Sequence, residues 1–190
     1  MTDFNGSKFF AKRKFWAVAG QVHVFDENNS LVCYVRQKIL KLKEDITVYN
    51  DEKMTEPVLS IKARQVVDFA AAYDVLDVLT GEKVGALKRK GWKSLLKDSW
   101  ILMDAADNEI GNLGEESSGG ALASRIINLI PQKYIMQTSG GSTIARFDQQ
   151  FAIAVHKFDI EFFDSAEPKI DRRLAMGALI LLLLIEGRQS

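Results

Sequence analysis

The sequence of 190 residues holds one cysteine, three prolines and two histidines, and its formal net charge at pH 7 is zero. A single thiol cannot form an internal disulfide. Cys33 stands within the apolar, strand-like run 31–35, so we expect it to be buried and unreactive. Because 25 basic residues balance 25 acidic ones, nucleic-acid binding through overall positive charge is not expected, although a local basic patch is compatible with a neutral average.

Signals for export and lipid attachment are also missing. The first residues contain no apolar stretch of the kind that a secretory signal peptide requires. Threonine at position 2 excludes N-myristoylation, and the C-terminus has no prenylation box. We therefore expect a cytoplasmic protein, either free or peripheral at the inner face of a membrane.

The motifs of the common enzyme classes do not occur either. The sequence has no G-x-S-x-G, no Walker lysine, no dinucleotide-binding fingerprint and no C-x-x-C. His23 and His156 alternate within strand-like runs, and neither has a cysteine or carboxylate at metal-ligand spacing. The sequence therefore predicts a non-enzymatic protein with no catalytic residues, cofactor or metal.

What the sequence does contain is a succession of short apolar segments, rich in β-branched and aromatic residues and separated by turn residues. This pattern predicts about twelve strands in a mainly β fold. The clearest hairpin joins residues 73–78 to 83–87 through a turn in which Gly81 supplies a positive φ. A second hairpin joins 100–103 to 109–111, and helical spacing predicts a short helix over 121–130, before Pro131. No linker divides the chain, so residues 1–190 are expected to form one domain.

Residues 174–185 are apolar on every face and lie between Arg173 and Glu186, with Asp171 as the expected N-cap and Gly187 as the expected C-terminal cap. Such a helix either crosses a membrane or is enclosed by protein. A bilayer core needs about 20 apolar residues, and a longer span here would bring charges into the hydrocarbon. Length therefore favours a helix buried inside a closed barrel.

Several stretches resemble the LURP-one-related family, which belongs with the phospholipid scramblases to the Tubby C-terminal-like group. They are residues 73–114, with the segment 85–90, Trp100 and the segment 107–114, and the run 158–162 that leads to Arg173 and the apolar helix. The resemblance extends from about Gln21 to Gly187. It implies a closed, roughly twelve-stranded Tubby-like β-barrel that encloses a hydrophobic C-terminal helix.

The resemblance implies lipid-responsive binding rather than lipid transport. Tubby-like proteins bind phosphoinositides, scramblases are linked to calcium and lipid movement, and plant members to defence. This chain has no proline-rich, cysteine-rich region of the kind that precedes the scramblase barrel. Four acids stand where scramblases are proposed to bind calcium, namely Asp159, Glu161, Asp164 and Glu167. The EF-hand spacing and its glycine are missing there, and alternation indicates a polar outer strand face instead of a metal site.

One run of concentrated positive charge, residues 88–97, contains five cations, one tryptophan and no acid. The candidate lipid-binding residues are Lys88, Arg89, Lys90, Trp92, Lys93 and Lys97. Cations near an anionic membrane contribute about 1 kcal/mol each, and tryptophan favours the interface. The alternative is a solvated strand end with Trp92 packed on the barrel wall. RNA binding would use the same residues and is disfavoured.

A second basic group, residues 8–14, interleaves with Phe9, Phe10, Phe15 and Trp16. It fits an amphipathic segment that touches a membrane, or an ordinary first strand, which we favour.

These observations favour a non-enzymatic module that recognises anionic phospholipid or phosphoinositide headgroups at a membrane surface. The alternative is a regulatory scaffold that binds a protein partner without lipid affinity. Lipid binding predicts that Lys88, Arg89, Lys90 and Lys93 share one exposed face, whereas a scaffold predicts an exposed apolar patch elsewhere. An enzyme with a ligand inside the barrel is disfavoured, because the helix would fill that space.

Overall fold

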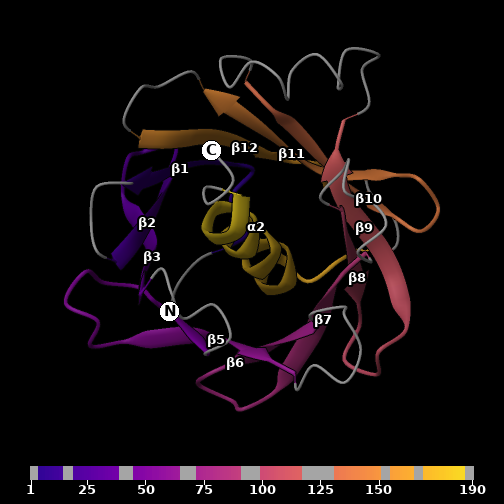
Figure 1. Cartoon of the computed structure of the whole chain (residues 1–190), viewed down its shortest axis with the longest axis horizontal. Helices are drawn as coiled ribbons and strands as arrows, with labels where there is room; N and C mark the ends of the chain where they lie inside the picture. Colours follow the sequence, from indigo (N-terminus) through magenta and orange to yellow (C-terminus); the bar gives the residue numbers. More distant parts are fainter. Residues whose placement is uncertain are drawn as a thin grey trace.

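The computed structural model describes residues 4–14, 19–38, 45–64, 72–90, 99–116, 131–150, 155–164 and 169–186. It consists of a ring of strands around one helix (Figure 1). The elements are β1 (Lys8–Lys14), β2 (Ala19–Asp26), β3 (Leu31–Lys38), β4 (Ile46–Tyr49), β5 (Pro57–Ala63), β6 (Ala72–Asp77), β7 (Lys83–Arg89), β8 (Ser99–Met103), β9 (Glu109–Glu115), β10 (Lys133–Thr138), β11 (Thr143–Gln150), β12 (Val155–Phe162) and α2 (Arg172–Glu186).

The strands form a closed antiparallel barrel in which each strand pairs with its neighbours in sequence. Closure comes from β1 and β12, which pair from Lys8 opposite Glu161 to Lys14 opposite Val155. Consecutive antiparallel strands give the barrel two distinct ends. We call the end with the turns 27–30, 50–56, 78–82, 104–108 and 139–142 the hairpin end. The opposite end, where β1, β3, β5, β7, β9 and β11 finish, is the loop end.

The turns of the hairpin end share one chemistry. In four of them an aspartate at or near the end of the preceding strand accepts hydrogen bonds from backbone N–H groups of the turn, which fixes the reversal of the chain. These aspartates are Asp26, Asp51, Asp77 and Asp104. Each of the five turns also contains one residue with positive φ, and they are Asn29, Met54, Gly81, Asp107 and Gly141. The predicted role of Gly81, with φ of 71°, is thereby confirmed.

Helix α2 lies inside the ring of strands, as Figure 1 shows. Residues 174–184 are all buried, and strand side chains that point inward, such as Ile61, Leu87 and Leu102, belong to the same core. A strand presents alternate residues to one face, as β12 shows, where Phe158, Ile160 and Phe162 are buried and Asp159 and Glu161 are exposed. The predicted burial of the helix inside a closed barrel is confirmed. In the part of the chain that the structure describes, every helix is too short or too polar to cross a membrane.

Both ends of α2 are tied to the barrel wall. At the hairpin end, Asp171 caps the helix, because its side chain accepts from the backbone N–H of Arg173 at 2.8 Å. The Arg173 side chain reaches Asp77 at the end of β6. At the loop end, the buried Arg13 of β1 donates to the backbone carbonyl of Leu183. A cation there also complements the negative end of the helix dipole.

The strand pattern of the sequence is confirmed closely, including both predicted hairpins. The second basic group forms the ordinary first strand that we favoured, with Phe9 and Arg13 facing the interior. The helix expected over residues 121–130 lies outside the described residues, as do Phe15, Trp16 and the helix cap expected at Gly187.

Candidate functional site

The described part of the basic segment lies at the loop end of the barrel. Lys88 is exposed near the end of β7, opposite Ala72 of β6 and Ile101 of β8. Lys90 directly follows β7 and is also exposed, and its backbone N–H donates to the Ser99 carbonyl at 2.8 Å. Both lysines therefore stand on the rim of the barrel. The other candidates, Trp92, Lys93 and Lys97, fall outside the described residues.

Arg89 lies differently from its two neighbours. It is half-buried, and in the strand register it stands opposite Trp100, whose side chain is only 2% exposed. Since side chains alternate between the two faces of a strand, Arg89 lies on the face toward the interior while Lys88 points outward. The expectation that Lys88, Arg89 and Lys90 share one exposed face therefore does not hold for Arg89.

An ion-pair network lies on the outer surface and joins Arg64, which follows β5 at the loop end, to Asp107 in a turn of the hairpin end. Arg64 bonds Asp74 at 2.6 Å, and Lys83 bonds Asp107 at 2.7 Å. Cross-links from Arg64 to Asp107 and from Lys83 to Asp74 complete the network. Hydrogen bonds from Lys83 and Arg64 lower the pKa of Asp107, so its carboxylate stays ionised. The negative charges of Asp74 and Asp107 are therefore balanced by the positive charges of Arg64 and Lys83.

Positive charge remains beyond this network. Lys62 is exposed on β5, and Lys88 is exposed on β7. Among the described residues, Lys88 forms no ion pair with an acid. Lys88 therefore presents positive charge to solvent near the loop end, within the part of the chain that the structure describes.

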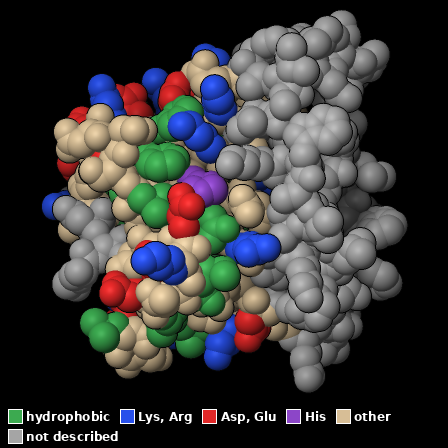
Figure 2. Space-filling model, turned by 90° about the vertical axis from the view of Figure 1, so that its left-hand side faces the viewer, with side chains coloured by type: hydrophobic (Ala, Val, Ile, Leu, Met, Phe, Trp, Pro, Cys, Tyr) green, Lys and Arg blue, Asp and Glu red, His purple; other side chains and the backbone are tan. Residues whose placement is uncertain are grey.

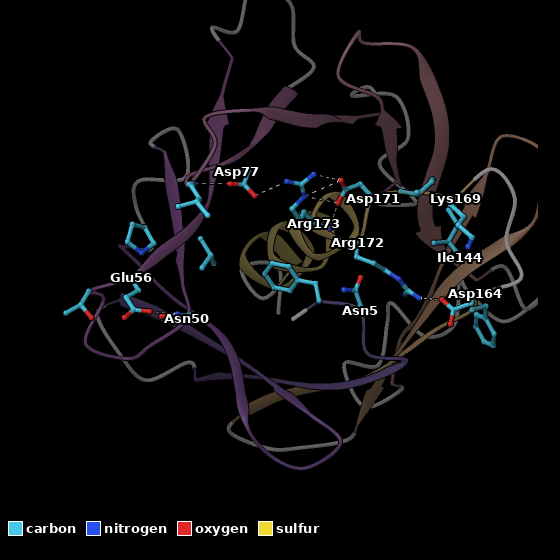
Figure 3. A pocket seen from close by; sticks show the side chains of 17 residues that line it. Asn5, Asn50, Glu56, Asp77, Ile144, Asp164, Lys169, Asp171, Arg172 and Arg173 are labelled. Atoms are coloured by element: carbon cyan, nitrogen blue, oxygen red, sulfur yellow. Dashed lines mark hydrogen bonds and ion pairs between the residues drawn. The ribbon is translucent and has the colours of Figure 1, made fainter. Parts of the chain in front are cut away.

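A second candidate site, which the sequence analysis did not predict, lies at the hairpin end. A cavity of about 1160 Å³ surrounds the N-terminus of α2 (Figure 3). Its lining comes from segments far apart in the sequence: Phe4, Asn5, Asn50, Thr55, Glu56, Pro57, Val58, Asp77, Leu79, Ile144, Phe163, Asp164, Lys169, Ile170, Asp171, Arg172 and Arg173. No local motif unites these residues, so only the closed barrel reveals the site.

Arg173 is the electrostatic centre of one side of this cavity. It bonds Asp171 at 2.7 Å and Asp77 at 2.8 Å, and it lies 3.7 Å from Glu82. The hydrogen bond from Arg173 is the main cause that lowers the pKa of Asp77. The groups that Arg173 contacts are thus carboxylates of the protein itself. The role of Arg173 is therefore to anchor the helix.

The four acids considered for calcium do not converge. Asp159, on the outer face of β12, accepts a hydrogen bond from Gln150, and Glu161 stands opposite Lys8 in the register with β1. Asp164 pairs with Arg172. Glu167 lies outside the described residues. Within the described ranges, no three His, Cys, Asp or Glu side chains are grouped so as to hold a metal ion.

The surroundings of His23 and of Cys33 indicate structural roles for both side chains. His23 lies on the outer face of β2, where its Nε2 is 3.3 Å from a Glu52 carboxylate oxygen and its ring stacks on Phe25. Figure 2 shows one face of the molecule, on which hydrophobic side chains gather around a histidine. Cys33 is fully buried, and burial raises the pKa of its thiol to about 12. The predicted buried thiol is confirmed. The His156 side chain is outside the described part.

A closed antiparallel barrel of twelve strands, filled by its own C-terminal helix, defines the fold class of this protein. The model of the LURP-one-related family matches residues 31–182, and the chain belongs to that family. The fold is also similar to the X-ray structure of a protein from Arabidopsis thaliana, with a TM-score of 0.52 and 10% sequence identity over 98% of this chain and 97% of that chain. At this identity the likeness concerns the fold alone. Among curated proteins, no sequence matches the chain.

Proposed function

We propose that this protein is a non-enzymatic module that binds anionic phospholipid headgroups, phosphoinositides among them, at the cytoplasmic surface of a membrane. The loop end of the barrel is the contact surface. The observation that supports this proposal is the exposure of Lys88 and Lys90 on the rim, at the start of a run of five cations without an acid.

The rim position suits a flat, negatively charged partner. A rigid closed barrel can approach a membrane end-on, so side chains at the strand ends reach the headgroups before the walls of the barrel do. Each cation near an anionic surface contributes about 1 kcal/mol, and the attraction is screened by salt. The nearby acid Asp74 does not oppose this, because Arg64 and Lys83 neutralise it.

The packing of the interior supports a role without catalysis. Helix α2 occupies the centre of the barrel, and its residues 174–184 are buried there. Small barrels that act on or carry a ligand hold it in this central space. Here the protein's own apolar side chains occupy that space.

A regulatory protein-binding scaffold is the second candidate, and a different surface favours it. On the outer face of β1 and β2, the rings of Phe10 and Phe25 are half-buried, and Lys12 lies over them at 4.9 and 5.0 Å. Aromatic side chains are enriched at protein interfaces. This surface would bind a protein partner in the absence of lipid.

Co-sedimentation with vesicles tests the first proposal. Neutral phosphatidylcholine vesicles are compared with vesicles that also contain phosphatidylserine or a phosphoinositide, over a series of salt concentrations and with or without calcium. We expect binding to the anionic vesicles alone, weakening as salt rises. No binding by the folded protein, or equal binding to neutral vesicles, would contradict the proposal and leave the scaffold as the better account.

A further inference from the structure

We propose that the cavity at the hairpin end is a second binding site, and that it takes a single-chain amphiphile with one negative charge, of the fatty-acid type. This site lies at the opposite end of the barrel from the membrane-binding rim. Its ligand would be a free molecule, and its occupancy does not depend on the proposed membrane contact.

The cavity has an apolar wall that suits a hydrocarbon chain. Phe4 and Ile144 are 7% and 4% exposed, and the neighbouring apolar lining residues Val58, Phe163 and Ile170 are half-buried. Ligand pockets combine such apolar walls with a few well-placed polar groups, and the mouth of a barrel is one of the places where they occur. With about 1160 Å³, the cavity is large enough for a molecule of this class.

Arg172 supplies a cationic group for the head of the ligand. Its guanidinium lies 4.2 Å from the centre of the Phe162 ring and pairs with Asp164. One terminal nitrogen, Nη1, is enclosed and has no acceptor among the described residues. A carboxylate accepts two parallel hydrogen bonds from a guanidinium, so after a small rotation Arg172 could bind a ligand carboxylate.

The partner of Arg172 is replaceable. The Asp164 side chain is 79% exposed, and exposed ion pairs are weak because water screens them. A ligand carboxylate that is sheltered by the apolar wall would compete well for the same guanidinium. Arg173, by contrast, is held by Asp77, Asp171 and Glu82, and is not available.

Lys169 adds a second positive charge on the same side of the cavity, where Figure 3 shows it near Ile144 and not far from the Arg172–Asp164 pair. It is exposed, and it forms no ion pair with any described residue. Together, Arg172 and Lys169 place positive charge beside the apolar wall. This arrangement orients an amphiphile with its head toward the two cations and its chain along Phe163 and Ile170.

The balance of charge limits the ligand to a single negative charge. The lining contains four carboxylates, Glu56, Asp77, Asp164 and Asp171, and three cations, Lys169, Arg172 and Arg173. A nucleotide or other polyanion would be repelled by this lining and would leave the apolar wall unused. A metal ion is also a poor fit, because each of these carboxylates already has a partner: Arg172, Arg173 or, for Glu56, the Asn50 side-chain amide at 2.6 Å.

Calorimetric titration with dodecanoate below its critical micelle concentration, without vesicles, tests the proposal. Butanoate carries the same head without the chain, and dodecanol carries the chain without the charge. We expect one dodecanoate per protein and at least tenfold weaker binding of both comparison ligands. Absence of binding to the folded protein, several molecules bound per chain, or equal binding of dodecanol would overturn it.

Substitutions at the cationic side locate the site. Lys169→Glu and Arg172→Gln should each weaken dodecanoate binding at least tenfold. Lys88→Glu makes the same charge change as Lys169→Glu at the other end of the barrel, and it should leave the affinity unchanged. Because Lys169 is exposed, its substitution keeps the test valid even if Arg172→Gln lowers stability. Equal binding by wild type and Lys169→Glu would contradict the proposal.

Discussion

Arg173 donates from Nη1 to the Asp77 carboxylate at 2.8 Å, which joins the first turn of α2 to the end of β6 across 96 positions of the sequence. At the other end of the helix, Arg13 donates to the Leu183 carbonyl across 170 positions. The helix is thus held at both ends by arginines that connect it to the wall. The apolar side chains of the helix alone would fix its position along the barrel axis less well, because hydrophobic contacts are not directional.

The Asp77–Arg173 pair predicts a dependence of stability on pH. The hydrogen bond from Arg173 lowers the pKa of Asp77 below its unfolded value, so the pair stabilises the fold above the unfolded pKa and this contribution is lost as pH falls through the folded pKa. Asp77→Asn should lower the unfolding free energy by about 1 kcal/mol near neutral pH, since both side chains are partly exposed. Urea denaturation should show the difference shrinking toward acid pH. If the difference in unfolding free energy between wild type and Asp77→Asn stays constant with pH, the prediction is contradicted.

Truncation of the enclosed helix should be costly. Leu179 is fully buried, and Leu179→Ala removes packed atoms and leaves a cavity, which should lower the unfolding free energy by about 2–5 kcal/mol. Leu79, which is 83% exposed, offers the same substitution as a control, and its cost should stay within about 0.5 kcal/mol. Urea denaturation of both variants makes the comparison. Similar costs at the two positions would show that α2 is not enclosed.

Close approach of the helix to the wall makes Gly85 sensitive. A Cβ added there would lie 2.5 Å from the Met103 carbonyl oxygen and 2.9 Å from Leu174 of the helix. Gly85→Ala should therefore destabilise the protein by about 1–3 kcal/mol through overpacking. Gly140→Ala is the control, because a Cβ there meets only the Thr138 hydroxyl at 3.7 Å. Thermal unfolding that does not distinguish the two variants would contradict the packing.

Burial should protect Cys33 from modification. Because its pKa is raised to about 12, the reactive thiolate is scarce at mildly alkaline pH, and the barrel wall also blocks access. Labelling with a thiol reagent should be at least a hundredfold slower in the native protein than in urea. Fast labelling under native conditions would mean that β3 opens readily.

Much of the fold could be predicted from the sequence, because alternation of apolar and more polar residues identifies a strand with one buried face, as in β4 and β12. The length of the run at 174–185 also distinguished a buried helix from a membrane span. The closure of about twelve strands into a barrel followed from the family resemblance, and the structure confirms it.

Side-chain direction at the ends of the strands was harder to predict. Arg13 and Arg89 stand in basic runs that suggest exposure, yet both occupy interior-facing strand positions. Arg13 binds the carbonyl of Leu183, which is far away in the sequence, so no local sequence pattern predicts this hydrogen bond. The cavity at the hairpin end was missed for the same reason, since its walls meet only when the barrel closes.

Binding of anionic membranes by the loop end is tested by placing the same charge change at either end of the barrel. Lys88→Glu/Lys90→Glu reverses two exposed cations on the loop-end rim, and Lys8→Glu/Lys53→Glu reverses two at the hairpin end. The variants have equal net charge, so any difference reports position. At about 1 kcal/mol per cation, vesicle co-sedimentation should show at least tenfold weaker binding for the first variant and nearly unchanged binding for the second. Equal loss of vesicle binding in both variants, or no loss in Lys88→Glu/Lys90→Glu, would contradict binding through the loop end.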